Sequence, residues 1–229
     1  MTAKDHAKYH QDPRCYGIWE LVREAVQTKD PDTMEALVLA QKYHRPIFGC
    51  SPLATGKALN EYLMSGVRVD HESYDHEEFL EKARKGIHTI IRESAVTKFL
   101  KENVRAITEG APGMARHTSF CSDDVNARGI LKEGHIDHMI HLAIAAGVEP
   151  IQMATINAAE AYQIDDHVGS IAPGKDADIL LVDQPGTFQV ETVISKGTLV
   201  TENGENKFHY VIPERTDDLL HTVQHTPLT

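Results

Sequence analysis

Side chains that can bind metals or move protons follow several short hydrophobic runs in this chain of 229 residues. A divalent cation held by carboxylate or imidazole groups lowers the pKa of a bound water, which becomes a nucleophile near neutral pH. Because parallel strands of one sheet end at the same edge, groups at their ends converge there. The groups concerned are Glu20, Cys50, Asp70, His71, Glu72, Arg92, Glu93, Ser122, Asp123 and Asp124. Their recurrence favours a metal-dependent hydrolytic site.

Each of these residues also has a purely structural interpretation. Glu20 could be a solvated carboxylate at the start of a helix, and His71 a loop residue bonded to its neighbours. Asp123 and Asp124 could cap a helix that begins a few residues later. Cys50, judged alone, could be interior packing. The alternatives stay open at the level of single residues.

Three further histidines, His135, His138 and His141, lie in the helical stretch 131–147. They are spaced at i, i+3 and i+6, so they spread over nearly half a turn of the helix surface. Most histidines are surface or satisfied interior residues. Packing is therefore the simpler interpretation of these three, and contact with the chemistry is the alternative.

The elements that must position these groups alternate between strand and helix. Short β-rich runs predict strands at 15–19, 45–50, 66–70, 87–92 and 117–121. Helical spacing of apolar residues predicts helices at 30–44, 56–65, 75–86 and 95–110. Strands that alternate with helices of this length predict a parallel sheet. The spacing does not decide whether the sheet is open or closed.

The pattern changes after the fifth strand. Two helical stretches, 131–147 and 150–163, precede a turn-rich segment and an apolar strand within 169–183. A hairpin is expected in 190–204, with its turn at Lys196 and Gly197. We therefore expect two units, residues 1–167 and a small β element with the C-terminal tail at 168–229.

Composition narrows the function classes. The formal net charge is -11, from 34 acidic and 23 basic side chains, which argues against a nucleic-acid partner because phosphate binding relies on Lys and Arg. No apolar run approaches the roughly 20 residues that cross a bilayer, and the first residues have no signal-peptide core. The three cysteines fit reduced thiols. A cytoplasmic location is the expectation.

Three stretches resemble the C-terminal half of the catalytic region of bacterial adenine deaminases, which are members of the amidohydrolase superfamily. They are "VRVDHES" at 67–73, "CSDDVNARGILKEGHIDHMIHLAIAAGVEPIQMATINAAEAYQI" at 121–164 and "GSIAPGKDADILLV" at 169–182. The last marks the wider superfamily, including hydantoinases and dihydroorotases. The first two point to the adenine deaminase branch. The resemblance extends from about Tyr16 to the end of the chain.

The resemblance implies a fold and an activity. It implies an α/β fold, a partial TIM-type (β/α) barrel of about five βα units followed by a small β-sandwich element. The implied reaction is hydrolysis of adenine to hypoxanthine and ammonia at a divalent metal centre of manganese, iron or zinc. Adenine is the implied small-molecule partner.

Residues carried over by the resemblance fall into two groups. Glu20 matches a strand-end carboxylate that can bridge two metals, His71 a barrel histidine ligand, and Asp123 the carboxylate of the last barrel strand. Asp123 would also manage the proton of the attacking water, so Glu20 and Asp123 are the catalytic candidates. Further candidates for metal binding or for lining the site are Cys50, Asp124, His135 and His138.

The chain departs from the family pattern in two places. The family has a His-x-His pair on its first barrel strand, and this sequence contains none. Where the family has "GHAPG", this chain has "GCSPL", so that Cys50 replaces a histidine. Five strands of an eight-stranded barrel leave two open edges, which favours a homo-oligomer or completion by another chain.

Three functional hypotheses follow. The first is a metal-dependent aminohydrolase that acts on adenine. The second is a non-catalytic homologue, which Cys50 and the missing His-x-His pair favour. The third is another cyclic-amide hydrolase of the superfamily, for which the expected mid-barrel lysine is not evident while Glu20 occupies a comparable strand end.

Overall fold

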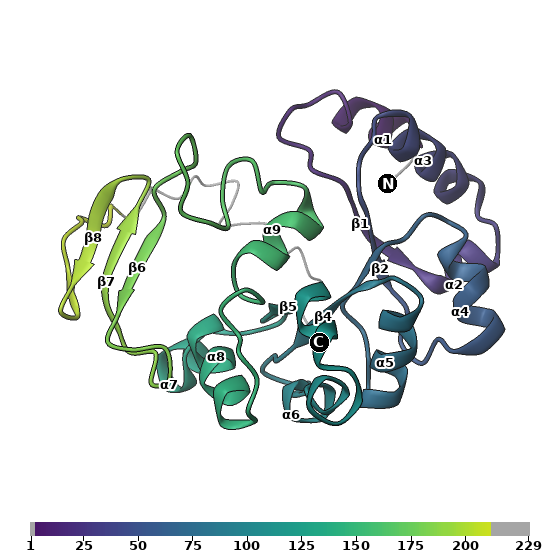
Figure 1. The fold of residues 1–229 in the computed structure, drawn as a ribbon. Helices are drawn as coiled ribbons and strands as arrows, with labels where there is room; N and C mark the ends of the chain where they lie inside the picture. Colours follow the sequence, from purple (N-terminus) through teal and green to yellow (C-terminus); the bar gives the residue numbers. More distant parts are fainter. Residues whose placement is uncertain (1–2, 212–229) are drawn as a thin grey trace, which may run out of the picture.

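A five-stranded parallel sheet forms the centre of the computed structural model, which describes residues 3–211. The strands are β1 Ile18–Val22, β2 Ile47–Cys50, β3 Val69–Asp70, β4 His88–Arg92 and β5 Thr118–Cys121. They lie side by side in sequence order, and every neighbouring pair is parallel (Figure 1). The five predicted strands are confirmed. Among the described residues β1 and β5 are the two edges of this sheet.

The first strand lies three residues later than predicted. It continues past Glu20 because Leu21 is buried and pairs with Gly49 of β2. Glu20 therefore projects from within β1, not from the loop after it.

Helices connect the strands, as a parallel sheet requires. They are α2 Arg23–Gln27, α3 Pro31–Lys42, α4 Gly56–Leu63, α5 His76–Arg84 and α6 Leu100–Asn103, and a further helix, α1 Ala3–Tyr9, precedes β1. Asp30 caps α3 by accepting a hydrogen bond from the Thr33 amide at 2.8 Å, and Asp75 caps α5 in the same way through Glu78. These caps satisfy amides that have no partner within the helix.

The helix predicted over 95–110 is shorter than expected. The Ser94 hydroxyl accepts hydrogen bonds from the amides of Val96 and Thr97, so this segment forms a turn instead of helix. Helix α6 begins only at Leu100. A π-helical turn at Ala106–Gly110 and a 3-10 segment at Pro112–His117 complete the connection to β5.

Three helices follow β5: α7 Ala127–Glu133, α8 Ile136–Ala145 and α9 Ile156–Tyr162. Gly134, with φ of 107°, separates α7 from α8. Four antiparallel strands then form a second sheet (Figure 1): β6 Ile179–Val182, β7 Val190–Ser195, β8 Thr198–Glu202 and β9 Glu205–Asn206. The predicted hairpin turn is confirmed, since Lys196 and Gly197 have φ of 46° and 77°. The segment 214–229, which gave no sequence signal, lies outside the described residues.

Hydrophobic side chains pack on both faces of the parallel sheet. One cluster joins β1 and β2 to α3 and includes Ile18, Leu37 and Ile47. Phe48, the next residue along β2, points to the opposite face and stacks on Tyr162 of α9 with ring centroids 4.6 Å apart. This packing fixes the strands and leaves their carboxyl ends to position polar groups.

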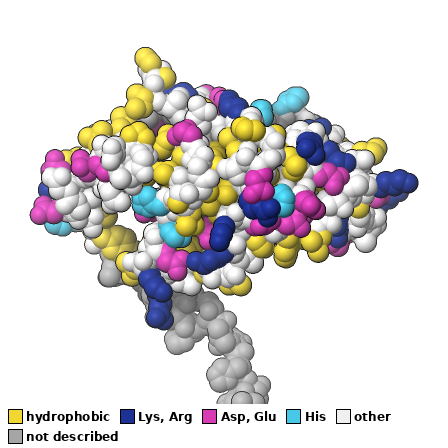
Figure 2. Space-filling model, turned by 60° about the horizontal axis from the view of Figure 1, so that its bottom comes forward, with side chains coloured by type: hydrophobic (Ala, Val, Ile, Leu, Met, Phe, Trp, Pro, Cys, Tyr) yellow, Lys and Arg dark blue, Asp and Glu magenta, His cyan; other side chains and the backbone are white. Residues whose placement is uncertain are grey.

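The surface is chemically mixed. Figure 2 shows acidic, basic and hydrophobic side chains interspersed over one face of the molecule, with no continuous basic area on that face. Within residues 3–211 no helix combines the length and apolar character needed to span a membrane.

His88 at the start of β4 is the clearest pH-sensitive group of the fold. Its Nε2 lies 2.9 Å from the Ser119 hydroxyl on β5. Burial lowers the pKa of His88 to about 4, and the neighbouring charges of His117 and Arg116 act in the same direction. The folded chain therefore favours the neutral ring.

We expect His88 to contribute to acid sensitivity. The unfolded chain binds a proton at this ring near pH 6.5 and the folded chain only near pH 4. Stability from this group is therefore complete above pH 6.5 and is lost as the pH falls toward 4, by roughly 3 kcal/mol at most. In His88→Asn the fall of the melting temperature between pH 6.5 and 4 should be shallower than in the parent protein. The exposed His209→Asn is the control, and equal slopes for all three proteins would contradict the expectation.

Candidate metal centre

His71 follows β3 directly, and its ring is held in one orientation. The side chain is 4% exposed, and Nδ1 donates a hydrogen bond to the Gly49 carbonyl oxygen at 2.9 Å. Because a carbonyl only accepts, the neutral ring carries its proton on Nδ1 and leaves the Nε2 lone pair free. Nε2 lies 3.5 Å from a Glu20 carboxylate oxygen and 3.7 Å from one of Glu72. His71 is therefore ready to bind a cation between two carboxylates.

Two groups of potential ligands share His71. One consists of Glu20, Cys50 and His71, and the other of His71, Glu72 and Asp123. Within each group the ligand atoms all lie within 4.8 Å of one another. Imidazole nitrogen, carboxylate oxygen and thiol sulfur are donors that suit zinc and iron. The convergence and the orientation of His71 both fit a divalent cation. Of the predicted ligands, Glu20 lies with His71 in the first group and Asp123 lies with His71 in the second.

The sheet explains why these residues meet. Strands β1, β2 and β3 are adjacent and parallel, so that Glu20, Cys50 and His71 reach the same edge. Asp123 comes from beyond β5, two strands away from β3, where the backbone takes a left-handed conformation with φ of 48°. That turn, and not the strand order alone, directs Asp123 to the site.

Arg92 at the end of β4 joins the two carboxylates of the second group. Its Nη1 lies 2.5 Å from Glu72 Oε1 and 2.6 Å from Asp123 Oδ2, and its Nη2 donates to Glu72 Oε2 at 3.0 Å. Burial raises the pKa of the Glu72 carboxyl, while the charge of Arg92 opposes that effect. Glu72 and Arg92 were expected only as polar groups at strand ends, and neither was assigned a ligand or catalytic role from the sequence.

Cys50 is a protonated thiol in this arrangement. Burial raises its pKa, and the hydrogen bond to Glu20 and the negative charge of that residue raise it further. A cation reverses this effect, because it stabilises the thiolate that binds it. Cys50 can therefore replace a histidine ligand only by releasing a proton.

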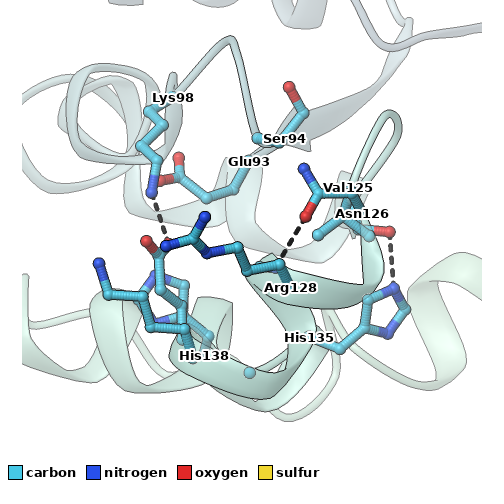
Figure 3. A pocket seen from close by; sticks show the side chains of 14 residues that line it. Glu93, Ser94, Lys98, Val125, Asn126, Arg128, His135 and His138 are labelled. Atoms are coloured by element: carbon cyan, nitrogen blue, oxygen red, sulfur yellow. Dashed lines mark hydrogen bonds and ion pairs between the residues drawn. The ribbon is translucent and has the colours of Figure 1, made fainter.

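The remaining candidates lie apart from the two ligand groups. Asp124 is exposed, and His135 Nε2 lies 2.7 Å from the Ser122 hydroxyl. His135 and His138 line a neighbouring polar pocket of about 250 Å³, together with Lys98 (Figure 3). Neither histidine belongs to a ligand group among the described residues.

The structure also shows the roles of the predicted helix-cap residues and of His141. The cap of α7 is Asn126, whose side chain accepts from the Gly129 amide at 2.9 Å, so Asp123 and Asp124 are not helix caps. His141 contacts the Thr187 carbonyl oxygen at 3.1 Å, which ties α8 to the loop before β7.

The chain is similar in sequence to a known protein family and to several named relatives. The profile described as "Amidohydrolase family" matches residues 19–200. The chain is 59% identical over 211 residues to "Adenine deaminase 1" of Latilactobacillus sakei subsp. sakei strain 23K, covering 91% of this chain and 36% of the relative. "Adenine deaminase 1" of Desulfotalea psychrophila is 55% identical over 222 residues, with coverage of 96% and 37%. The chain thus spans little more than a third of the length of these relatives.

Solved structures share the fold at low sequence identity. The beta-aspartyl dipeptidase of Fervidobacterium islandicum AW-1 superposes with a TM-score of 0.64 at 18% identity, covering 90% of this chain and 62% of that one. Atrazine chlorohydrolase TrzN of Arthrobacter aurescens TC1, solved with zinc, gives a TM-score of 0.53 at 16% identity, with coverage of 79% and 49%. The predicted fold class, a partial (β/α) barrel with a small β element, is confirmed.

Gly49 meets two structural requirements of the site, a carbonyl oxygen that bonds to His71 and a position with no room for a side chain. Its carbonyl oxygen orients His71, and a Cβ at this position would lie 2.5 Å from the Tyr62 hydroxyl oxygen and 2.7 Å from Val67 Cγ1. The hydroxyl of Tyr62 also accepts a hydrogen bond from the Cys50 amide at 3.0 Å, so it cannot move without cost.

We expect Gly49→Ala to lower the free energy of unfolding by about 1–3 kcal/mol, the usual cost of overpacking. Gly113→Ala is the matched control, because a Cβ there meets no atom within 4 Å. Its effect should stay within about 0.5 kcal/mol. Urea unfolding of the three proteins measures both values, and equal stability of the two variants would show that the contacts of Gly49 do not matter.

Proposed function

Because the chain belongs to the amidohydrolase family, we propose that its strand-end residues hold a divalent cation, zinc, iron or manganese, for the hydrolytic deamination of adenine. The observation that carries the proposal is the orientation of His71. The Gly49 carbonyl fixes the ring so that Nε2 faces the carboxylates of Glu20 and Glu72. The similarity to proteins named adenine deaminase supports adenine as the substrate.

The proposed reaction assigns separate tasks to the residues of the site. Glu20, Cys50 and His71 would hold the cation, which when bound supplies Lewis-acid activation of water at neutral pH. The Asp123 carboxylate takes a proton from the attacking water and returns it to the departing amino group, so that ammonia leaves and hypoxanthine forms. Arg92 holds Asp123 in place through its 2.6 Å ion pair.

A non-catalytic homologue is the second candidate. Cys50 stands where the family resemblance calls for a histidine, and it favours this alternative. We also propose that β1 and β5, which are the sheet edges within residues 3–211, associate with further strands from a second copy or from another chain, since an unpaired edge presents free backbone groups.

His71→Asn should weaken metal binding most. Loss of the central ligand should lower zinc affinity by more than about 100-fold, since loss of outer partners alone costs 10–100-fold. Asp124→Asn, a neighbouring exposed carboxylate outside both ligand groups, is the control and should bind zinc like the parent protein. Competition with a chelating dye gives the affinities. Absence of zinc, iron and manganese binding in the parent protein would overturn the proposed centre, and metal binding without release of ammonia from adenine would support the non-catalytic homologue.

Cys50→His should change metal preference. Thiolate selects zinc and iron, whereas carboxylate-rich sites suit manganese. Replacing the thiol by imidazole should therefore lower the ratio of zinc affinity to manganese affinity, as measured by titration of each metal. Cys121→Ser is the control for removal of a thiol, and it should leave the ratio unchanged. An unchanged ratio in Cys50→His would show that Cys50 is not a ligand.

A further inference from the structure

A buried ammonium group lies directly behind the ligand-bearing strand ends. Lys82 of α5 has a completely buried side chain. Its Nζ donates to Asp70 Oδ1 at 3.0 Å and to the Ser51 carbonyl oxygen at 2.9 Å, and it forms an ion pair with Glu78 Oε1 at 2.8 Å. It also donates to the Glu72 carbonyl oxygen. The ammonium group is thus surrounded by oxygen atoms from three separate segments.

Asp70 extends this network between strands β2 and β3. Its side chain is also fully buried, and Oδ2 accepts from the Ser51 hydroxyl at 2.7 Å. Its Oδ1 accepts from the Glu72 amide at 2.9 Å. Lys82 and Asp70 together therefore connect the segment after β2 with the segment after β3.

The residues that Lys82 binds are direct neighbours of candidate ligands in the sequence. Ser51 follows Cys50, and Asp70 precedes His71. Glu72, which Lys82 contacts only at the backbone carbonyl, turns its carboxylate away toward Arg92. Among the described residues Lys82 has no hydrogen bond or ion pair with a ligand atom of either group, so any effect on metal binding passes through the backbone.

Stability alone is a weak reason for this arrangement. Removing a charge from water is costly, and apolar packing of similar volume is often as stable as a buried ion pair or better. The structure instead uses an ammonium group with several directed hydrogen bonds. Such bonds fix the relative position of two loops more narrowly than apolar contacts do.

We propose that Lys82 is a positioning residue for the candidate metal centre. By bonding to Ser51 and Asp70, it holds the loops after β2 and β3 at the separation that brings the thiol of Cys50 and the ring of His71 together. The inference rests on the proposed metal function, because it concerns the geometry of that same centre.

The main test compares two lysines of the same region. Lys82→Met removes the buried ammonium group. Lys85→Met removes a partly exposed one that bonds to Glu81 at 3.2 Å and to Asn60. We expect Lys82→Met to bind zinc 10–100-fold more weakly and to shift the visible absorption of bound cobalt(II), which reports ligand geometry. Lys85→Met should match the parent protein in both measurements.

Ser51→Ala tests the same network if Lys82→Met does not fold, because the Ser51 hydroxyl holds Asp70, the carboxylate that Lys82 binds. It removes only the hydroxyl bond to Asp70 and leaves every charge paired. Zinc affinity should fall by about 2- to 10-fold, equivalent to one hydrogen bond, with a change of the cobalt spectrum in the same direction. Circular dichroism verifies folding of each variant.

The outcomes separate this inference from the proposed function. Folded variants with the zinc affinity and cobalt spectrum of a metal-binding parent would overturn the role of Lys82 alone. A parent protein that binds neither metal would overturn the proposed centre, and the positioning role with it.

Discussion

The hydrogen bond from His71 Nδ1 to the Gly49 carbonyl oxygen is the constraint on which the candidate site depends. It exists because β2 and β3 are parallel neighbours, with Gly49 paired to Asp70. It also requires that position 49 has no side chain, since the Tyr62 hydroxyl occupies that space. The register of the sheet thus sets the tautomer of the imidazole, and the tautomer decides which nitrogen faces the carboxylates. The hydrogen bond to the backbone therefore determines which nitrogen of His71 is available as a ligand.

Two cationic side chains, Arg92 and Lys82, bind the segment after β3 that carries Glu72. Arg92 binds the carboxylate oxygens of Glu72, whereas Lys82 binds the backbone carbonyl of that residue and the buried Asp70. Carboxylates brought this close repel one another in a partly buried setting, and opposite charges offset the repulsion. A cation held by Glu72 would share that carboxylate with the guanidinium group of Arg92. Lys82 bonds to none of the ligand atoms of the two groups among the described residues.

Local patterns predict the five strands, and the carboxyl ends of all but the first, because each buried parallel strand is a short apolar run that needs no knowledge of its partners. Cys50 and His71 could therefore be placed at strand ends from the sequence, whereas the predicted end of the first strand was wrong and Glu20 lies within β1. The pairing of Arg92 with Glu72 and Asp123 could not be predicted, since it depends on side-chain directions across three strands. The helix over 95–110 was wrong at its start because a single hydroxyl, that of Ser94, redirects the amides there.

Cysteine at position 50 couples metal binding to proton release more strongly than histidine would. A histidine ligand is largely neutral at pH 7 and binds without losing a proton. The Cys50 thiol has a pKa raised by burial and by Glu20, so binding must supply the free energy to remove its proton. The same carboxylate that opposes the thiolate also belongs to its ligand group. A bound cation would offset this repulsion, so the thiolate form of Cys50 would become compatible with the Glu20 carboxylate.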